Sequence, residues 1–467
     1  MTSLIQHIYD IRSGKSNIKD QINIYTSRAD NSSFNSWIKI LKLDDMTNIY
    51  DFDKLINKPL AGAAIGVKDL IMTKDIETTC GSKMLSGYIP SYNATCVQNL
   101  INNGAVMMGK NNLDEFAMGG SGENSAFWIV QNSKALWRIS GGSSSGSAVA
   151  VAADECIASI GTDTWWSVRQ PAAMCGIVGF KPTYWFVSRY GVQSMANSLD
   201  QVWVLAKTVD DAWLLLQNIW WYDSKDSTSQ DYTKLLNPDS SVKKIAIIKE
   251  FYSDGLDSQI ADRLNIYISK LKNLWYIVED VNFDLLKYVV AVYYTIMPAE
   301  ASTNLARFDG VKFGAKAFDT KNYINYKDYL TSLRSELFGE EVKRRIMIWW
   351  YVLSAWFADK YYHKAIEIRN AICAKFDQIF TWYDVILGPT TPTAARLIWS
   401  VDDPLADYLA DIYTIPANLA WIPAINVPTG TIHIDNQDLP IWLQIMWNKR
   451  NELKVVELAK VLEGFWS

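Results

Sequence analysis

The pattern of apolar and polar positions predicts that helices and strands alternate along the chain. Residues 1 to about 57 are polar, are predicted to be helical and end in a short linker. The run LAGAAIGVKDL at residues 60–70 is apolar and then becomes charged, which is typical of a buried strand that carries a polar group, Lys68, to its end. Residues 95–109 predict a helix followed by the strand AVMMG. A Gly/Ser loop then leads into the helical SAVAVAA and a strand at residues 157–160.

The second half of the chain continues this alternation. KKIAII, an amphipathic stretch at residues 260–274 and YIVEDV predict a strand-helix-strand unit, and helices are predicted from about 285 to 380. The strand DVILGPT comes next, and the final segment, which contains IPAINVPTG, is predicted to be irregular. Strands that alternate with helices indicate an α/β fold built in layers. A length of 467 residues is compatible with several domains or with one large α/β unit.

Composition and charge indicate an ordinary globular protein. The hydrophobic fraction of 49% and the charged fraction of 20% allow a large buried core. The chain begins without a signal peptide and has no stretch near the roughly 20 apolar residues of a membrane helix, so we expect a cytoplasmic protein that does not contact a membrane. The net charge of −5 comes from interleaved acidic and basic residues, which does not indicate direct nucleic-acid binding. Five scattered cysteines favour neither a disulfide framework nor a zinc site.

Tryptophan is unusually frequent, with 20 residues against only 24 glycines. Several tryptophans occupy positions where a large ring is awkward. They include the pair Trp165-Trp166, and Trp275, where a predicted helix gives way to a strand and glycine is the usual residue. Two hypotheses explain the excess. Either the rings are genuine core residues, or most of these positions are encoded by UGA, which is stop in the standard code, tryptophan in one variant code and glycine in another.

Candidate chemistry does not involve histidine. The chain has only three histidines, His7, His363 and His433, and none lies in a Gly/Ser-rich loop, so neither a Ser-His-Asp triad nor a histidine metal site is favoured. The chain offers instead Lys68 after a strand, a Gly/Ser loop at residues 141–147 and the segment GTDTWWSVRQP. Taken alone, the loop is compatible with a simple linker, because it lacks the Gly-Lys-Ser/Thr ending of a P-loop. The lysine, taken alone, is compatible with a solvated charge on the surface.

Taken together and in this order, the three features resemble the amidase signature family. Gly66-Val67-Lys68-Asp69 fits the family's lysine motif, and Ser143 and Ser167 stand 24 residues apart (167 − 143), as in the family's two loops. The chain departs from the family pattern at Ser145, at Phe186 and at the pair Trp165-Trp166. The resemblance implies one amidase domain over residues 1–467, with a helical N-terminal segment at 1–57 and an α/β fold whose large, mixed, twisted sheet is covered by helices on both faces. The family pattern also favours glycine at Trp128, Trp165, Trp166, Trp185, Trp203, Trp221, Trp275, Trp356, Trp421, Trp442 and Trp447.

The resemblance also implies a catalytic site. Ser167 corresponds to the nucleophile, Ser143 to a second serine held by a cis peptide bond, and Lys68 to the base that receives the proton. The backbone N–H groups of residues 164 to 167, which include Thr164, Trp165 and Trp166, would hold the oxyanion. Close approach of a substrate to this backbone requires glycine at 165 and 166. If both tryptophans are genuine, we expect a distorted or inactive site.

Within the family, motifs outside the core resemble the glutaminase subunit of the tRNA-dependent amidotransferases. They are STNLARFDG, FGEEVKRRI and DDPL at residues 402–405. By position in the motifs, Tyr293, Arg345 and Asp411 match residues that hold glutamine. The chemistry agrees, because Arg345 can pair with the α-carboxylate and Asp411 can accept from the α-ammonium.

This resemblance further implies a heterotrimer with the B and C subunits of the amidotransferase. The B subunit would bind the misacylated Glu-tRNA(Gln) or Asp-tRNA(Asn), activate it with ATP and Mg²⁺ and receive ammonia, so no cofactor or metal is expected in this chain. Two alternatives stay open. One is a stand-alone amidase that acts on another amide, and the other is a non-catalytic scaffold subunit, which genuine tryptophans at 165 and 166 would favour.

Overall fold

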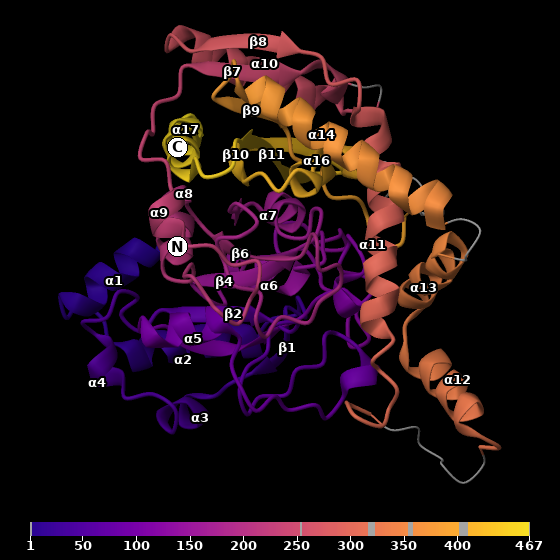
Figure 1. Ribbon diagram of the computed structural model, residues 1–467. Helices are drawn as coiled ribbons and strands as arrows, with labels where there is room; N and C mark the ends of the chain where they lie inside the picture. Colours follow the sequence, from indigo (N-terminus) through magenta and orange to yellow (C-terminus); the bar gives the residue numbers. More distant parts are fainter. Residues whose placement is uncertain (1, 253–254, 316–322, 354–357, 401–409, 467) are drawn as a thin grey trace.

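One sheet of eleven strands runs through the computed structural model, which describes residues 2–252, 255–315, 323–353, 358–400 and 410–466 (Figure 1). In spatial order the strands are β1 (Trp37–Ile40), β3 (Val106–Asn111), β2 (Ala64–Lys68), β4 (Ala158–Asp163), β6 (Gln201–Ala206), β5 (Val178–Lys181), β10 (Ala424–Ile434), β11 (Gln437–Trp447), β9 (Val385–Pro389), β7 (Lys244–Ile248) and β8 (Ile277–Val281).

Strand directions in this sheet are mixed. Strands β3, β2 and β4 are parallel neighbours, and so are β9, β7 and β8. The strands between these two groups pair antiparallel from β4 through to β9. The predicted α/β fold with a large mixed sheet is therefore confirmed.

Sixteen of the described segments are α-helices. They are α1 (Leu4–Arg12), α2 (Ile18–Asp30), α3 (Leu43–Thr47), α4 (Phe52–Leu55), α5 (Thr95–Asn102), α6 (Ser145–Ala152), α7 (Arg169–Cys175), α8 (Val209–Gln217), α9 (Tyr232–Leu235), α10 (Ser258–Asn273), α11 (Val289–Leu305), α12 (Tyr326–Leu337), α13 (Glu340–Leu353), α14 (Lys364–Phe380), α16 (Ile415–Leu419) and α17 (Glu452–Gly464). The other helical segments are the 3-10 turns η1 (Lys83–Leu85), η2 (Glu115–Ala117), η3 (Lys249–Phe251), η4 (Leu286–Tyr288) and η6 (Ala410–Tyr413), and the π-helix η5 (Ala358–His363).

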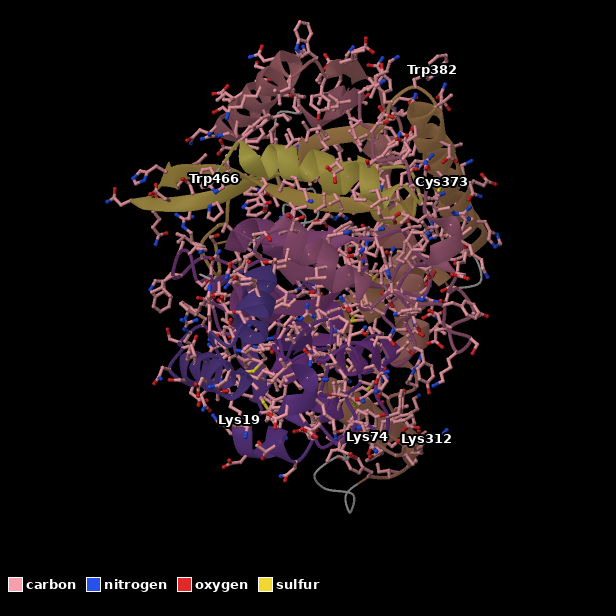
Figure 2. All side chains as sticks on the ribbon, turned by 90° about the vertical axis from the view of Figure 1, so that its left-hand side faces the viewer. Lys19, Lys74, Lys312, Cys373, Trp382 and Trp466 are labelled. Carbon is pink, nitrogen blue, oxygen red and sulfur yellow. The ribbon has the colours of Figure 1, made fainter. Side chains whose placement is uncertain are left out.

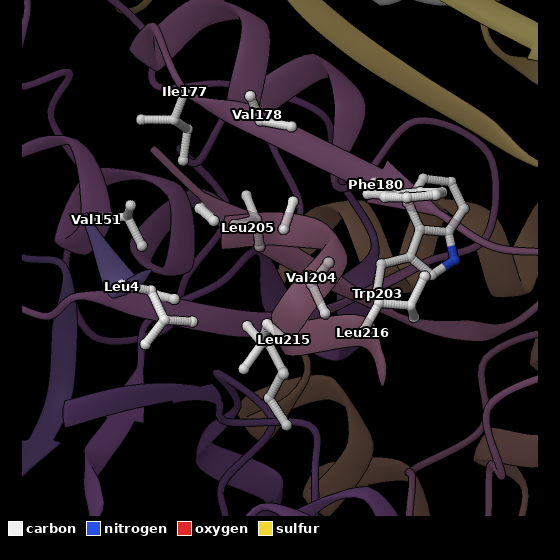
Figure 3. Packing of buried hydrophobic residues seen from close by; sticks show 14 of the residues in the cluster. Leu4, Val151, Ile177, Val178, Phe180, Trp203, Val204, Leu205, Leu215 and Leu216 are labelled. Carbon is white, nitrogen blue, oxygen red and sulfur yellow. The ribbon is translucent and has the colours of Figure 1, made fainter. Parts of the chain in front are cut away.

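The central strands are covered on both faces. Every residue of β2, β3, β4, β5 and β6 is buried, which is typical of strands packed between two layers of helices. Helix α6 packs on β4, and α8 packs on β6. Figure 3 shows part of the buried cluster around β6, which includes Trp203, Val204 and Leu205 of this strand, Leu215 and Leu216 of α8, and Phe180 of β5.

The N-terminal segment is mostly helical, as predicted, but the structure corrects one part of it. Residues Trp37–Ile40 form strand β1, which pairs antiparallel with β3 at the edge of the sheet. Four residues are too short for a clear alternation of apolar and polar positions. Pairing with β3 and burial of Trp37 therefore decide the conformation.

The prediction of an irregular final segment was wrong. IPAINVPTG lies largely in β10, which forms a long antiparallel hairpin with β11. Pro428 and Gly430 obscure the strand pattern, and they flank the point where the register shifts, at a bulge. The bulge accommodates Pro428, which has no N–H to donate to the ladder.

Charged and aromatic side chains are spread over the surface. Figure 2 shows Lys19, Lys74 and Lys312 toward one end of the molecule, and Trp382 and Trp466 at its edges, where 69% and 51% of these two tryptophans are exposed. Among the described helices, none combines the length and the apolar character that a membrane span needs.

We expect Leu205→Ala to destabilise the protein, because Leu205 is completely buried in the middle of the sheet. Truncation of a core leucine lowers the free energy of unfolding by about 3 kcal/mol. Thermal denaturation should show a clear drop in Tm, whereas the control Leu136→Ala, at a side chain that is 47% exposed, should leave Tm nearly unchanged. Equal effects of the two substitutions would contradict the position of the core.

Candidate active site

The candidate catalytic residues lie where two parallel strands end. Lys68 is the last residue of β2, and Ser167 follows the end of β4 at Asp163. Because β2 and β4 are parallel neighbours, their carboxyl ends meet at the same edge of the sheet. The Gly/Ser loop that leads into α6 brings Ser143 to this edge.

Lys68 is completely buried and is held by oxygen atoms. Its Nζ donates to Ser143 Oγ at 2.8 Å, to Thr162 Oγ1 at 3.0 Å and to the Thr162 carbonyl at 3.2 Å. Burial lowers the pKa of Lys68 to about 7, although the nearby carboxylates of Asp163, Asp114 and Asp200 favour the charged form. A substantial fraction of the amine is therefore neutral near pH 7 and able to accept a proton.

Ser143 follows a cis peptide bond from Gly142, as the resemblance implies. Its loop contacts the nucleophile loop through the backbone, since the N–H of Ser144 donates to the Ser167 carbonyl at 3.0 Å. Ser167 is 1% exposed, and within the described part of the chain its hydroxyl has no hydrogen-bond partner. The structure thus brings Lys68, Ser143 and the Ser167 loop together, while a hydrogen bond from Ser167 to Ser143 stays a prediction.

Two buried aspartates hold the loop that contains Ser167. Thr164 Oγ1 donates to Asp200 Oδ1 at 2.7 Å, and the backbone N–H of Val168 donates to Asp163 Oδ2 at 3.0 Å. Burial raises the pKa of Asp200 to about 7. The sequence alone does not show that Asp200 binds Thr164, because the two residues lie 36 positions apart.

Arg169 is another residue of the site that sequence reasoning missed. Its buried guanidinium donates to the Trp165 carbonyl at 3.0 Å, to the Thr414 carbonyl at 2.8 Å and to Gln444 Oε1 at 2.8 Å. These bonds tie the backbone at residue 165 to the C-terminal half of the chain. The signal was its place directly after Ser167-Val168, but two of its partners, Thr414 and Gln444, lie more than two hundred residues away.

The rings of Trp165 and Trp166 fill the space beside the Ser167 loop. Trp165 is completely buried, with its ring 4.7 Å from that of Tyr293 and 5.1 Å from the Arg345 guanidinium carbon. Trp166 packs so closely on Gly120 that a Cβ there would lie 2.5 Å from the indole. Neither indole N–H has a partner among the described residues, although buried donors are normally paired. The two unpaired indole donors are therefore an unfavourable feature of the packing at positions 165 and 166.

Backbone angles at other tryptophans point the same way. Trp275 and Trp421 have φ angles of +67° and +59°, and so do Trp137 and Trp399 at +66° and +59°. This left-handed region is costly for a residue with a bulky side chain and is normally occupied by glycine.

Trp356, like residues 402–405, lies outside the described residues. Phe186 is buried, and nothing in the structure explains its presence.

The candidate glutamine-binding residues surround the same region. Arg345 on α13 and Asp411 on η6 line a cavity of about 320 Å³ together with Trp166, and Tyr293 on α11 is buried against Trp165. Arg345 Nε donates to Glu341 Oε1 at 2.7 Å, and Asp411 Oδ2 accepts from the Tyr294 hydroxyl at 3.0 Å. The structure therefore brings all three together, with the Trp165 ring between Tyr293 and Arg345.

Within the described ranges, no three His, Cys, Asp or Glu side chains lie close enough together to bind a metal ion.

Glu341 is a further member of the cavity wall that the sequence did not single out. Its spacing of four residues from Arg345 on a helix was the available signal.

Comparison with known proteins identifies the class of this chain. The profile of the family described as Amidase matches residues 21–456, so the chain belongs to the amidase family. The A subunit of the glutamyl-tRNA(Gln) amidotransferase of Acaryochloris marina is 48% identical over 410 residues, which cover 86% of this chain and 84% of the relative. The subunit of the same name from Halothermothrix orenii is 46% identical over 409 residues, with the same coverage.

A solved structure agrees with these relatives. The crystal structure of the A subunit of glutamyl-tRNA(Gln) amidotransferase from Thermotoga maritima superposes with a TM-score of 0.79 at 35% identity, covering 97% of this chain and 95% of that one. The resemblance to the amidase signature family, and within it to the A subunit of these amidotransferases, is therefore confirmed.

We predict that Ser167 reacts with phenylmethylsulfonyl fluoride in the glycine variant, by which we mean the chain carrying Trp165→Gly and Trp166→Gly. The labelling rate should rise with pH through about 7, because protonated Lys68 cannot accept a proton and neutral Lys68 can. Mass spectrometry of the labelled peptide measures the rate.

Lys68→Ala should slow this labelling and Ser167→Ala should abolish it, whereas Ser269→Ala, at an exposed serine of α10, serves as the matched control. A labelling rate that is independent of pH between about 6 and 8 would argue against Lys68 as the base.

Proposed function

We propose that this chain is the glutaminase subunit of a tRNA-dependent amidotransferase. The observation that carries the proposal is the hydrogen bond of 2.8 Å between the buried Lys68 amine and Ser143, beside the Ser167 loop. Similarity to the A subunits of A. marina and H. orenii over 86% of the chain supports the same activity. The chain would hydrolyse glutamine and supply the ammonia that converts Glu-tRNA(Gln) to Gln-tRNA(Gln), or Asp-tRNA(Asn) to Asn-tRNA(Asn).

The proposed mechanism begins with proton transfer. Ser167 gives its proton to Ser143 as Ser143 gives its own to neutral Lys68, and Ser167 Oγ attacks the side-chain carboxamide of glutamine. Backbone N–H groups of residues 164 to 167 stabilise the oxyanion. The proton returns to the departing nitrogen, ammonia leaves, and a glutamyl ester remains on Ser167. Water then attacks this ester by the same proton path and releases glutamate.

Recognition of glutamine is assigned to the cavity wall. The Arg345 guanidinium binds the α-carboxylate, Asp411 accepts from the α-ammonium, and Tyr293 lies against the substrate. With glycine at 165, the volume of the indole between Tyr293 and Arg345 becomes available to glutamine. The substrate would then lie between these residues and the Ser167 loop.

The proposed assembly is a heterotrimer with the B and C subunits of the amidotransferase. The B subunit would hold the misacylated tRNA and use ATP and Mg²⁺ to activate it, and this chain would need no cofactor of its own. The net charge of −5 agrees with a subunit that does not grip RNA tightly. The complex would act in the cytoplasm.

One observation favours a second candidate, a non-catalytic scaffold subunit. With tryptophan at 165 and 166, the rings occupy the space that a substrate needs, and two buried indole N–H groups have no partner in the described part of the chain. The scaffold function follows only if these residues are present in the natural protein.

We predict that the protein from its native source carries glycine at positions 165, 166, 275 and 421. The reason is the crowding at the first two positions and the positive φ angles at the others. Peptide mass spectrometry measures each residue, and the codons are expected to be UGA. Trp37, which is buried in β1 and donates its N–H to Glu155 at 2.8 Å, serves as the control and should be tryptophan. UGG codons at 165 and 166 would reject the glycine hypothesis.

The glycine variant, assembled with its partner subunits, should hydrolyse glutamine. Ser167→Ala in the variant should lower kcat by at least about a thousandfold, because the nucleophile is lost. Release of ammonia from glutamine measures this activity. Turnover that survives Ser167→Ala would contradict the nucleophile, and efficient hydrolysis of other small amides by the isolated chain would favour a stand-alone amidase.

A further inference from the structure

Glu115 connects the catalytic half of the site to the helix that carries Arg345. This glutamate lies in η2, after β3, and is 2% exposed. Its Oε2 accepts from the backbone N–H of Gly339 at 2.7 Å, and its Oε1 accepts from the Ser82 hydroxyl. No step of the proposed mechanism uses this buried carboxyl group.

Gly339 marks the beginning of α13. The N–H of Lys343 donates to the Gly339 carbonyl at 3.1 Å, so the helical bonds begin at this residue and its own N–H points out of the helix. The Glu115 carboxyl group binds this N–H, as a side chain of a capping box would from within the helix. A Cβ at position 339 would collide with Glu115 Oε2, which explains the need for glycine there.

Aromatic packing strengthens the same connection. Phe116, next to Glu115, lies 5.7 Å from Phe338 and 5.1 Å from Phe308, measured between ring centroids. The neighbour on the other side, Asp114, donates its N–H to the Ser143 carbonyl at 3.3 Å. The three consecutive residues 114–116 therefore contact both the Ser143 loop and the start of α13, which Figure 1 shows beside α11.

We infer that Glu115 is a positioning residue for substrate binding: by holding Gly339 it fixes the start of α13 and so the place of Arg345 relative to Ser167. This inference rests on the proposed function, in which Arg345 binds the α-carboxylate of glutamine. Arg345 lies less than two helical turns beyond Gly339, so a displacement of the helix start moves its guanidinium. Loss of the contact should weaken glutamine binding without altering the proton path from Ser167.

The chemistry of the contact identifies a conservative variant. Burial raises the pKa of Glu115 to about 7, and the protonated acid keeps both contacts, because one oxygen donates to the Ser82 hydroxyl and the other accepts from Gly339. A glutamine side chain can do the same with its amide. Glu115→Gln should therefore leave the KM for glutamine as it is in the parent, by which we mean the glycine variant with Glu115 in place. Glu115→Ala removes the contact.

Steady-state glutamine hydrolysis by the glycine variant, assembled with its partner subunits, tests the inference. Glu115→Ala should raise KM about tenfold, as loss of one buried bond to a carboxyl group would, and should change kcat less than about twofold. Labelling of Ser167 by phenylmethylsulfonyl fluoride should keep its rate, because this reagent does not need Arg345. Glu115→Gln should restore the parent KM.

A double-mutant cycle with Gly339→Ala makes the test specific. Gly339→Ala alone should raise KM, because its Cβ displaces the Glu115 carboxyl group, but it should add little in the Glu115→Ala background, where the obstacle is gone. If Glu115→Ala yields no folded protein, the effect of Gly339→Ala on KM decides instead.

Results that differ from these expectations reject either the positioning role of Glu115 alone or the proposed glutaminase function as well. An unchanged KM in Glu115→Ala, with the parent active, rejects the positioning role and leaves the glutaminase function intact. A joint fall of kcat and labelling rate shows general distortion and also rejects the role. A parent that does not hydrolyse glutamine rejects the function and the inference together, and its labelling rate shows whether Ser167 itself is competent.

Discussion

The site depends on one constraint, the burial of the Lys68 amine. A lysine that is surrounded by protein loses the hydration that stabilises its charge, and so its pKa falls to about 7. The β2 strand places this amine at the end of the sheet, and Thr162, at the end of the neighbouring strand β4, supplies two of its acceptors. The third acceptor is Ser143, so the same packing that lowers the pKa also directs the amine toward the serine loop. Without burial, the amine would be charged at neutral pH and could not serve as a base.

The surroundings of Ser167 are held by hydrogen bonds from both halves of the chain. Asp163 and Asp200 bind the loop from within the N-terminal half, while Arg169 joins its backbone to Thr414 and Gln444 near the C-terminus. This loop also contains residues that fit the fold poorly. The indoles at 165 and 166 leave buried donors unpaired within the described ranges, and tryptophans elsewhere have φ angles that suit glycine. The glycine that we propose in place of tryptophan would remove both kinds of misfit.

Sequence reasoning could predict the features that local patterns encode. The apolar run before Lys68, the Gly/Ser loop and the spacing of Ser143 and Ser167 sufficed to predict the class of protein and the residues that the structure brings together. The pattern could not predict β1, because four residues give too little periodicity, nor the β10–β11 hairpin, because Pro428 and Gly430 interrupt it at a bulge. Contacts such as Arg169 with Gln444 depend on tertiary structure alone, and so no local signal could reveal them.

The central claim is that Ser167 forms a covalent bond with the glutamyl group once glycine stands at 165 and 166. Acid quench of the glycine variant in its complex during turnover of radiolabelled glutamine, followed by peptide mapping, tests this most directly. We predict radiolabel on the peptide that contains Ser167, and none when Lys68 is replaced by alanine. Radiolabel on a different residue during active turnover would contradict it.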